Sequence, residues 1–453
     1  MLREYPIGPA FLEAFRRMSR DELREIQNRR FLRVMQRGWE IPFYRRLWTA
    51  RGLEPGDIRS LEDITRLPPY EKSDIIRSVE EHPPLGDFHG IDSAPAHVKP
   101  TVVLHTTSGT TGRPQPLLFG PRTREMQNLL LARAYLLQGL RDSDVVHSVY
   151  GHGLVNGGHY IRETVLHFTG ALFISAGTGV ETRSRTQVEY MRDFGVTVLV
   201  GFIDYIRHLA DVAREMGIVP GRDIKVRMIS GGFGRERREI LAEAWGGAET
   251  YDWYGIADTG VQAAEGPDHA GCYIWEDAHY FEIIDPDTHD PLPAGQTGNI
   301  CTTVLFKDDI YPCIRFNTND LSSIEPSDDS PLGLRLRRMT GFLGRSDNMV
   351  KLRGINVYPT AIGGILQSEP GTTGEFICRV DREGSRDEMT VLVEVRAGAA
   401  ERTDLAARYR SLLRSRLGVD VVVEPVDPGT LAPLTEIERR QKPIRLIDAR
   451  FKT

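Results

Sequence analysis

The stretch Val196-Thr-Val-Leu-Val-Gly-Phe202 decides the fold class, because a short apolar run rich in β-branched residues is typical of a buried strand. It lies in a segment where such strands alternate with helices. The predicted strands cover residues 196–202, 226–231 and 250–253, and the predicted helices cover residues 188–194, 204–216 and 236–245. This alternation indicates βαβ units, in which helices cover both faces of a parallel sheet. We therefore expect an α/β fold.

Two of these strands run directly into glycine-containing loops, Ser230-Gly231-Gly232-Phe233-Gly234 and Trp253-Tyr254-Gly255-Ile256-Ala257-Asp258. Ligands of parallel sheets bind at the carboxyl ends of the strands, so both loops are candidate ligand loops. For a nucleotide, Tyr254 could stack on a base, Gly255 would allow close approach, and Asp258 could hold Mg²⁺ near the phosphates. Each loop taken singly is also typical of an ordinary turn.

Upstream lies Thr106-Thr107-Ser108-Gly109-Thr110-Thr111-Gly112-Arg113-Pro114, where glycines alternate with small hydroxyl residues. Glycine lets successive N–H groups point into one concavity, and the hydroxyls add donors, which together suit a polyphosphate. It is not a Walker A loop, because Arg113 stands where that motif has lysine. Predicted strands at residues 102–104 and 116–119 flank it, and a polar hairpin turn is the alternative interpretation.

The composition is that of an ordinary globular protein: 453 residues, 40% hydrophobic, 26% charged, with a net charge of -6. The mild acidity argues against a nucleic-acid partner. No apolar run approaches the roughly 20 residues that span a bilayer, so we expect a soluble cytoplasmic protein without a membrane partner.

Cysteines and histidines do not predict a metal site or a disulfide framework. The four cysteines are far apart, at Cys272, Cys301, Cys313 and Cys378. The sequence cluster His147, His152, His159 and His167 contains no His-x-x-x-His spacing, and no cysteine joins it. Reducing cytoplasm is the expected compartment.

The remaining chain divides into three regions. Residues 1–100 are predicted to begin with helices, since Ser19 and Glu22 match a capping box. A turn-rich segment at 285–296 separates two predicted antiparallel strands, 281–284 and 299–304, which indicate a β-rich subdomain. Beyond residue 346 a small α+β unit is predicted, with strands at 376–380, 389–395 and 419–423 and a helix at 405–417. We predict a large domain, 1–346, and a small C-terminal domain, 347–453.

Three further motifs complete an ordered set: Arg315-Phe-Asn-Thr-Asn-Asp320, Gly344-Arg345-Ser-Asp-Asn-Met-Val-Lys-Leu-Arg-Gly354-Ile-Asn-Val-Tyr-Pro359 and Gln441-Lys442-Pro-Ile-Arg445. With the Ser/Thr/Gly loop they resemble the successive core motifs of the adenylate-forming superfamily of acyl-CoA synthetases and adenylation domains. The likeness is greatest to the phenylacetate-CoA ligase branch, which is similarly short and also lacks a lysine just after the loop, where this chain has Gln115. The resemblance covers roughly residues 101–448.

The resemblance implies a role for each matched residue. ATP or AMP would contact Thr107, Ser108, Gly109, Thr110, Thr111, Gly112, Trp253, Tyr254, Gly255, Asp320 and Arg345, with Asp320 and Arg345 on the ribose hydroxyls. Lys442 would be the catalytic lysine, Asp258 the catalytic Mg²⁺ ligand and Asp347 the hinge of a mobile C-terminal lid domain. Lys351, Arg353 and Gly354 would face the thioester-forming site. Lys442 could alternatively be an exposed lysine in a polar tail.

The acid pocket would match the family's acyl-binding regions. It would draw on Tyr150, His152, Gly153, Asn156, Gly157, Gly158, Gly231, Gly232 and Phe233. Aromatic and polar residues there favour a planar aromatic acid with polar substituents, although aromatic side chains near such loops are also typical of core.

The implied reaction uses ATP, Mg²⁺ and coenzyme A. A carboxylate oxygen attacks the α-phosphorus of ATP, and Lys442 with Mg²⁺ stabilises the developing charge as pyrophosphate leaves. A thiol then attacks the acyl-adenylate, once rotation about Asp347 admits it.

Three departures from the family pattern keep other readings open: Asp258 stands for glutamate, Asn319 for the glycine of Thr-Gly-Asp, and Gly232-Phe233 for Ala/Gly-Glu. The acceptor could be a carrier-protein thiol, an amine or a small inorganic nucleophile such as nitrite. AMP could pass to a hydroxyl, as in coenzyme F390 synthetases, or the chain could be a catalytically inactive nucleotide-binding module. A homodimer is also left open.

Overall fold

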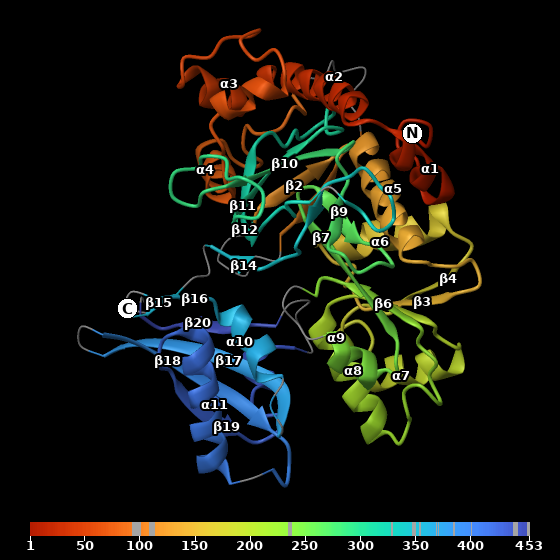
Figure 1. Ribbon diagram of the computed structural model, residues 1–453, viewed down its shortest axis with the longest axis vertical. Helices are drawn as coiled ribbons and strands as arrows, with labels where there is room; N and C mark the ends of the chain where they lie inside the picture. Colours follow the sequence, from red (N-terminus) through yellow and green to blue (C-terminus); the bar gives the residue numbers. More distant parts are fainter. Residues whose placement is uncertain are drawn as a thin grey trace.

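The computed structural model describes residues 1–92, 101–107, 114–233, 238–327, 329–346, 350–352, 355–367, 369, 371–383, 386–399, 401–437 and 443–450. Figure 1 shows a large N-terminal part and a smaller C-terminal unit, drawn in blue, that lies beside the green helices of the large part. No helix within those ranges combines the length and apolarity needed to cross a membrane. The expected α/β class and its two-part organisation are confirmed.

An eight-stranded sheet forms the centre of the large part, in the order β13-β9-β8-β7-β6-β5-β3-β4. Its strands are β3 (Val145–Ser148), β4 (Leu172–Ser175), β5 (Val198–Val200), β6 (Met228–Gly231), β7 (Glu249–Ile256), β8 (Gly260–Glu265), β9 (Cys272–Ile274) and β13 (Arg338–Met339). The five strands from β4 to β7 pair in parallel, and those beyond β7 pair antiparallel. The parallel block is the predicted βαβ region.

Helices cover both faces of this block. They are α5 (Pro121–Leu137), α6 (Gly157–Phe168), α7 (Ser184–Asp193), α8 (Ile203–Glu215) and α9 (Arg238–Ala244). Alternate residues of a strand point to opposite faces, and in β5 Val198 and Val200 join the core with α5 and α6, whereas Leu199 joins the core with α7, α8 and α9. This two-sided burial explains why the three residues of β5, Val198–Val200, are all apolar.

A second sheet carries residues of the later motifs. It consists of β10 (His279–Ile284), β11 (Gly298–Val304), β12 (Phe316–Ser322) and β14 (Gly344–Arg345), all antiparallel. The pairing of β10 with β11 confirms the predicted strands around the turn-rich segment. Separately, β1 (Val103–Thr106) pairs with β2 (Pro116–Phe119), and Thr106 faces Pro116, so two strands flank the Ser/Thr/Gly loop as expected.

The first hundred residues contain the predicted helices: α1 (Gly8–Arg17), α2 (Arg20–Trp39), α3 (Pro42–Thr49), the short 3-10 helix η1 (Leu61–Arg66) and α4 (Lys72–Glu81). The capping box is present, since the Ser19 side chain accepts from the Glu22 N–H and Glu22 accepts from the Ser19 N–H. The helical region is interrupted before Pro42: α2 ends at Trp39 and α3 begins at Pro42, because proline in the first helical turn needs no N–H donor there.

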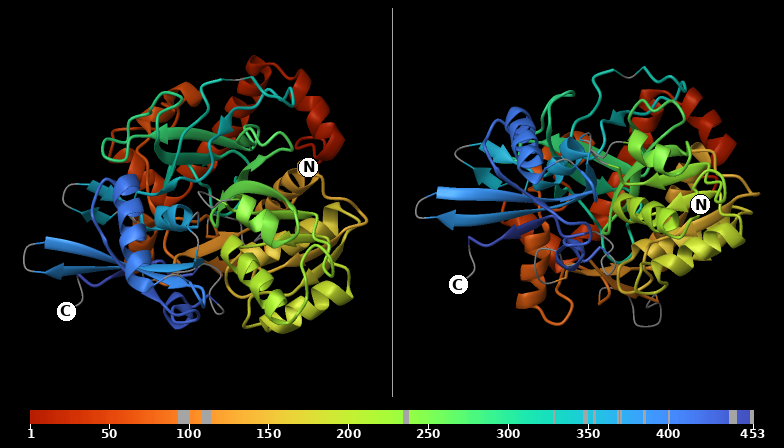
Figure 2. Two further views of the ribbon diagram at one scale, coloured as in Figure 1. Left: turned by 60° about the horizontal axis from the view of Figure 1, so that its bottom comes forward. Right: turned by 90° about the horizontal axis from the view of Figure 1, so that it is seen from below.

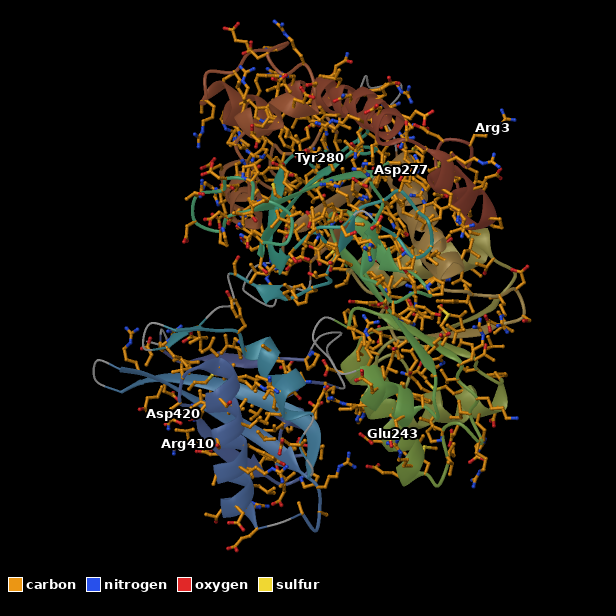
Figure 3. All side chains as sticks on the ribbon, viewed as in Figure 1. Arg3, Glu243, Asp277, Tyr280, Arg410 and Asp420 are labelled. Atoms are coloured by element: carbon orange, nitrogen blue, oxygen red, sulfur yellow. The ribbon has the colours of Figure 1, made fainter. Side chains whose placement is uncertain are left out.

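A buried ion pair joins these helices to the sheet. Arg133 on α5 donates to Asp277 at 2.8 and 3.0 Å, and its Nε donates to the Pro6 carbonyl. Figure 3 shows Asp277 among the N-terminal helices and α5. Both side chains are almost completely buried, so the pair is enclosed by the core.

The C-terminal unit is an α+β structure with its own core. It contains β15 (Val350–Leu352), β16 (Ile355–Val357), α10 (Pro359–Leu366), β17 (Thr372–Glu383), β18 (Arg386–Val395), α11 (Arg402–Leu417), β19 (Val422–Val426), α12 (Ala432–Thr435) and β20 (Leu446–Asp448). Strands β15 and β16 pair with each other, and the other four strands form a sheet in the order β19-β18-β17-β20. Figure 2 shows β17 and β18 extending away from the large part. The last predicted strand begins at Val422 rather than residue 419, although Val419 and Val421 are buried in this core.

Candidate functional site

Three residues from three distant motifs meet at one point. The Tyr254 hydroxyl donates to Asp320 Oδ2 at 2.8 Å, and Arg345 Nη1 donates to Asp320 Oδ1 at 2.8 Å. Burial raises the pKa of Tyr254 well above its usual value, so its hydroxyl remains a donor. The carboxylate of Asp320 is therefore held from both sides by oriented partners.

The strands explain this meeting. Asp320 on β12 lies directly opposite Arg345 on β14, and Tyr254 lies near the end of β7. The next residue, Gly255, approaches β8 so closely that a Cβ there would lie 2.5 Å from the Gly260 carbonyl oxygen. Only glycine fits, which gives the Tyr-Gly pair of the sequence a steric reason.

Asn319 stands before Asp320 with a φ of 58°. This left-handed conformation suits glycine, and asparagine tolerates it better than most residues. The Asn319 side chain also bonds outward: its Nδ2 donates to Glu71 at 3.3 Å and its Oδ1 accepts from Asn299 at 3.2 Å. The departure from Thr-Gly-Asp therefore preserves the backbone shape that the motif requires.

Asp258 is 4% exposed and its Oδ1 accepts two hydrogen bonds, from Gln115 Nε2 at 2.7 Å and from the Tyr311 hydroxyl at 3.1 Å. Burial raises the pKa of Asp258, an effect opposed by Lys307 and by these two donors. Within the described part of the chain, Oδ2 accepts no hydrogen bond. An oxygen with this freedom fits a hard cation such as Mg²⁺.

Lys307 is the residue of this region that sequence reasoning missed. It is fully buried, its Nζ donates to the Asp258 carbonyl at 2.8 Å, and it lies 4.0 Å from the centroid of the Tyr311 ring. Burial lowers the pKa of Lys307. Gln115 and Tyr311 were also not predicted as neighbours of Asp258, because they lie 143 and 53 residues away in sequence.

Hydrogen bonds between Thr107 and Gln115 join the two ends of the Ser/Thr/Gly loop. The Thr107 N–H donates to the Gln115 carbonyl at 3.0 Å, and the Gln115 N–H donates to Thr107 Oγ1 at 3.0 Å. One residue earlier, the Thr106 N–H donates to the Leu154 carbonyl at 2.8 Å. The loop base is thus connected to the segment that was predicted to bind the acid.

Aromatic side chains gather on the predicted acid side. The Tyr150 ring lies 4.6 Å from the Phe202 ring and 6.4 Å from the Trp253 ring, centroid to centroid. Trp253 Nε1 is buried and has no hydrogen-bond partner among the described residues. A Cβ at Gly157 would lie 3.6 Å from Tyr150, so the start of α6 packs beside this ring.

The polar residues of the same segment lie around α6. Asn156 is the N-cap residue of α6 and donates through Nδ2 to Gln127 at 2.9 Å. Within the segment 150–158, α6 begins at Gly157. His152 packs edge-on against His159, with ring centroids 5.8 Å apart, and His159 Nε2 lies 2.8 Å from the Gly153 carbonyl.

The loop that follows β6 packs closely against neighbouring strands at one glycine but not at the next. A Cβ at Gly231 would lie 2.2 Å from the Gly201 carbonyl oxygen, whereas one at Gly232 would meet its nearest atom at 3.9 Å. The Phe233 N–H donates to Asp252 Oδ1 at 2.8 Å. Burial raises the pKa of Asp252 to about 7. Phe233 itself is 2% exposed and packs in the core cluster of α8 and α9, and its role in the acid pocket stays a prediction.

Several predicted site residues lie outside the described residues: Ser108, Gly109, Thr110, Thr111, Gly112, Asp347, Arg353, Gly354 and Lys442. For Lys351 the backbone is described, in β15, but not the side chain. The structure brings Tyr254, Asp320 and Arg345 together and places Tyr150 beside Trp253, and the roles of all the predicted site residues stay predictions.

An α/β core with a Tyr–Asp–Arg cluster, followed by a small α+β unit, agrees with the adenylate-forming class of enzymes that the motifs resemble. Residues 354–450 match the AMP-binding enzyme C-terminal domain. The crystal structure of 2-hydroxyisobutyryl-CoA ligase in the postadenylation state with R3-HIB-AMP is 28% identical to this chain. It aligns with a TM-score of 0.86 over 99% of this chain and 94% of that one.

The same ligase in the thioesterification state, with 2-HIB-AMP and CoA, gives a TM-score of 0.69 at 29% identity, over 97% of this chain and 92% of that one. The phenylacetate-coenzyme A ligase of Pseudomonas putida is 31% identical over 442 residues, which cover 93% of this chain and 94% of that enzyme. The chain belongs to the phenylacetate-coenzyme A ligase branch of the adenylate-forming enzymes, which confirms the resemblance seen in its motifs. It is an AMP-forming acid–thiol ligase that activates an acid with ATP and passes the acyl group to coenzyme A.

Proposed function

We propose that the acid is aromatic, that Mg²⁺ accompanies ATP, and that the predicted site residues act in the roles given above. The observation that carries the proposal is the Asp320 carboxylate, held at both oxygens by Tyr254 and Arg345. A carboxylate oriented in this way is a suitable acceptor for ribose hydroxyls. The hydrogen bond to Asp320 also fixes the Tyr254 ring, which would stack on adenine.

Asp258 is the proposed Mg²⁺ ligand. Gln115 and Tyr311 fix the carboxylate through Oδ1, which leaves Oδ2 for the cation. Bound there, Mg²⁺ would neutralise charge on the phosphates as the α-phosphorus is attacked. The buried Lys307 lies on the carbonyl side of the same residue and holds its backbone in place.

The reaction has two steps. An oxygen of the substrate carboxylate forms a bond to the α-phosphorus of ATP, and the bond to pyrophosphate breaks, giving acyl-AMP. The sulfur of coenzyme A then forms a bond to the acyl carbon, AMP leaves, and the thiol proton passes to solvent. Lys442 would stabilise the first transition state, and Lys351, Arg353 and Gly354 would lie beside the second after rotation about Asp347.

The aromatic character of the acid is proposed from Tyr150, which lies beside Phe202 and Trp253. Flat rings of this kind favour an aromatic acid through offset or edge-on contacts. Trp253 Nε1, which has no hydrogen-bond partner among the described residues, would suit a polar substituent on the aromatic ring of the acid. The relatives named phenylacetate-coenzyme A ligase support the same class of acid.

The test is acid-dependent exchange of pyrophosphate into ATP over benzoates, phenylacetates, cinnamates and fatty acids, with products identified by mass spectrometry. Asp320→Ala should lower kcat/KM for ATP by about a hundredfold, equivalent to about 2.7 kcal/mol of transition-state stabilisation. Asp287→Ala, in an exposed turn, is the matched control and should leave the exchange unchanged. Wild-type enzyme that shows no exchange with any acid would contradict the proposal.

Product identity also tests the acceptor. Coenzyme A thioester is the expected product, whereas acyl-AMP that accumulates with coenzyme A present would favour a carrier-protein thiol. The homodimer that the sequence leaves open is tested separately by sedimentation velocity, where a monomer would reject it.

A further inference from the structure

A cluster of four charged side chains joins the C-terminal unit to helix α8 of the large part. Arg445 Nη2 lies 2.8 Å from Asp204 Oδ1, and Arg207 Nη2 lies 2.7 Å from Glu375 Oε1. Arg445 Nη1 also lies 2.9 Å from Glu375 Oε2. Asp204 and Arg207 belong to α8, and Glu375 belongs to β17. We call these four residues the α8 clasp.

Within each part the charges are complementary as well. Arg207 Nη2 lies 3.4 Å from Asp204 Oδ1, so α8 contributes an acid and a base that already pair. In the C-terminal unit, Glu375 and Arg445 pair in the same way. Positive and negative charges therefore alternate around the α8 clasp, and each of these four contacts joins opposite signs.

The α8 clasp is mostly sheltered from water. The four side chains are 10–24% exposed. Although burial acts to raise it, Arg445 and Arg207 hold the pKa of Glu375 below its usual value. An ion pair in this setting is screened less by salt than a surface pair, and the loss of one partner leaves a buried charge uncompensated.

Close packing is incomplete beside the α8 clasp. A cavity of about 280 Å³ is lined from both parts, by Arg207 and Glu243 on one side and by Thr373 and Arg396 on the other. Figure 3 shows Glu243 on the side of α9 that faces the C-terminal unit. Ile437 adds an apolar contact to the core under α8. This part of the interface can therefore separate without breaking a large apolar core.

The comparison structures give an independent observation. One enzyme in its postadenylation state aligns with a TM-score of 0.86, but in its thioesterification state with 0.69. The arrangement of the two parts in this chain, in which the α8 clasp is formed, is thus more similar to the postadenylation state than to the thioesterification state.

Arg445 connects the clasp to the segment of the predicted catalytic lysine. It follows Lys442 by three residues and directly precedes β20. Its carbonyl accepts from the Cys378 N–H at 2.9 Å, and its guanidinium lies over the Phe376 ring at 4.7 Å. Fixing Arg445 on α8 therefore fixes the start of β20 relative to the large part.

We propose that Glu375 and Arg445 are positioning residues for the adenylation half-reaction: with Asp204 and Arg207 they hold the C-terminal unit on helix α8, and these contacts separate before coenzyme A attacks the acyl-adenylate. The inference rests on the proposed function for its two half-reactions. It adds the residues that hold one of the two arrangements.

The test inverts the charges of one side at a time. Asp204→Arg with Arg207→Glu keeps the two α8 positions complementary, but places like charges opposite Arg445 and Glu375. Glu375→Arg with Arg445→Glu does the same from the other side. When all four substitutions are combined, every contact of the α8 clasp again joins opposite charges, so an effect of the interface alone should be reversed.

The half-reactions are measured separately, with phenylacetate and ATP for pyrophosphate exchange and with synthetic phenylacetyl-AMP and coenzyme A for thioester formation. Each one-sided inversion should lower the exchange rate at least about tenfold, while thioester formation stays within about twofold of wild type. The fourfold variant should recover exchange to within about threefold. The proposal is overturned if both half-reactions fall together, if exchange is unchanged, or if the fourfold variant does not recover.

Arg410→Glu with Asp420→Arg is the matched control, since it inverts an ion pair within the C-terminal unit, labelled in Figure 3, without touching α8. Small-angle scattering without substrates provides a second measurement. One-sided inversions should increase the radius of gyration, and the fourfold variant should restore it. An unchanged radius would overturn the clasp, whereas wild-type enzyme that shows no exchange with any acid of the panel would overturn the proposed function and leave the scattering test intact.

Discussion

At the scale of single residues, Asn319 shows how a departure from the family motif can keep the backbone conformation of the site. Asn319 occupies a left-handed conformation that the glycine of the usual motif would adopt without strain. Its side chain adds hydrogen bonds to Glu71 and Asn299. The residue before Asp320 is therefore constrained by φ first and by side-chain bonding second.

This ranking predicts the outcome of two substitutions. Asn319→Gly keeps the backbone conformation but loses two hydrogen bonds, so the free energy of unfolding should fall by about 1 kcal/mol, with KM for ATP unchanged. Asn319→Val places a β-branched side chain at positive φ, and should cost about 3 kcal/mol and raise KM for ATP. Urea unfolding with ATP kinetics measures both. Equal effects of glycine and valine would show that φ is not the constraint.

At the scale of elements, the start of α6 shows how backbone contact shapes the acid side. A Cβ at Gly158 would lie 2.2 Å from the Gly151 carbonyl oxygen, too close for any real contact. At Gly153, five residues earlier in the same segment, a Cβ would have nothing within 4 Å. The two glycines therefore differ in what they permit, although the sequence alone treats them alike.

We expect Gly158→Ala to displace the start of α6 from the segment 150–156, and to raise KM for the acid at least about tenfold while KM for ATP changes little. Leu166→Ala, at an exposed side chain further along α6, is the control and should leave both values within about twofold. Initial-rate kinetics with the preferred acid separates these outcomes. A Leu166→Ala variant as impaired as Gly158→Ala would argue against a steric cause at the start of the helix.

The sequence predicts elements better than it predicts contacts between them. Residues 196–231 show their strands and helices through apolar periodicity, and the structure confirms these elements. The cluster around Asp258 was not predictable, because no periodicity links Gln115, Lys307 and Tyr311, which only the packing of different sheets brings together. Similarly, Val419 and Val421 are apolar enough for a strand and are buried, but the pairing with β18 begins at Val422.

At the scale of the whole molecule, buried histidines make the free energy of unfolding depend on pH. Burial lowers the pKa of His147 to about 4 and that of His279 to about 3, from a usual value of 6.5. Below pH 6.5 the two histidines bind protons in the unfolded chain, whereas in the folded protein they stay neutral until the pH reaches their lowered pKa values. Stability from this source is therefore full above pH 6.5, and it is lost as the pH falls towards 4 and then 3.

For His147 alone the loss between pH 6.5 and 4 should be about 3 kcal/mol. His147→Asn should flatten that part of the pH dependence in urea unfolding, although its stability at pH 8 will be lower because the contact with Gln187 changes. His82→Asn, at a side chain that is 49% exposed, should leave the slope as in wild type. A slope that His147→Asn leaves unaltered would contradict the assignment.

The N-terminal helices have a further consequence, for synthesis on the ribosome. Side chains of α2 bind the segment after β9: Arg20 and Gln27 contact Glu276, and Arg30 contacts Asp277, across 247–256 residues of sequence. These polar partners emerge only after more than half of the chain has been made. The first helices therefore cannot dock until the segment that binds them has been synthesised, and their docking is a late, long-range step of folding.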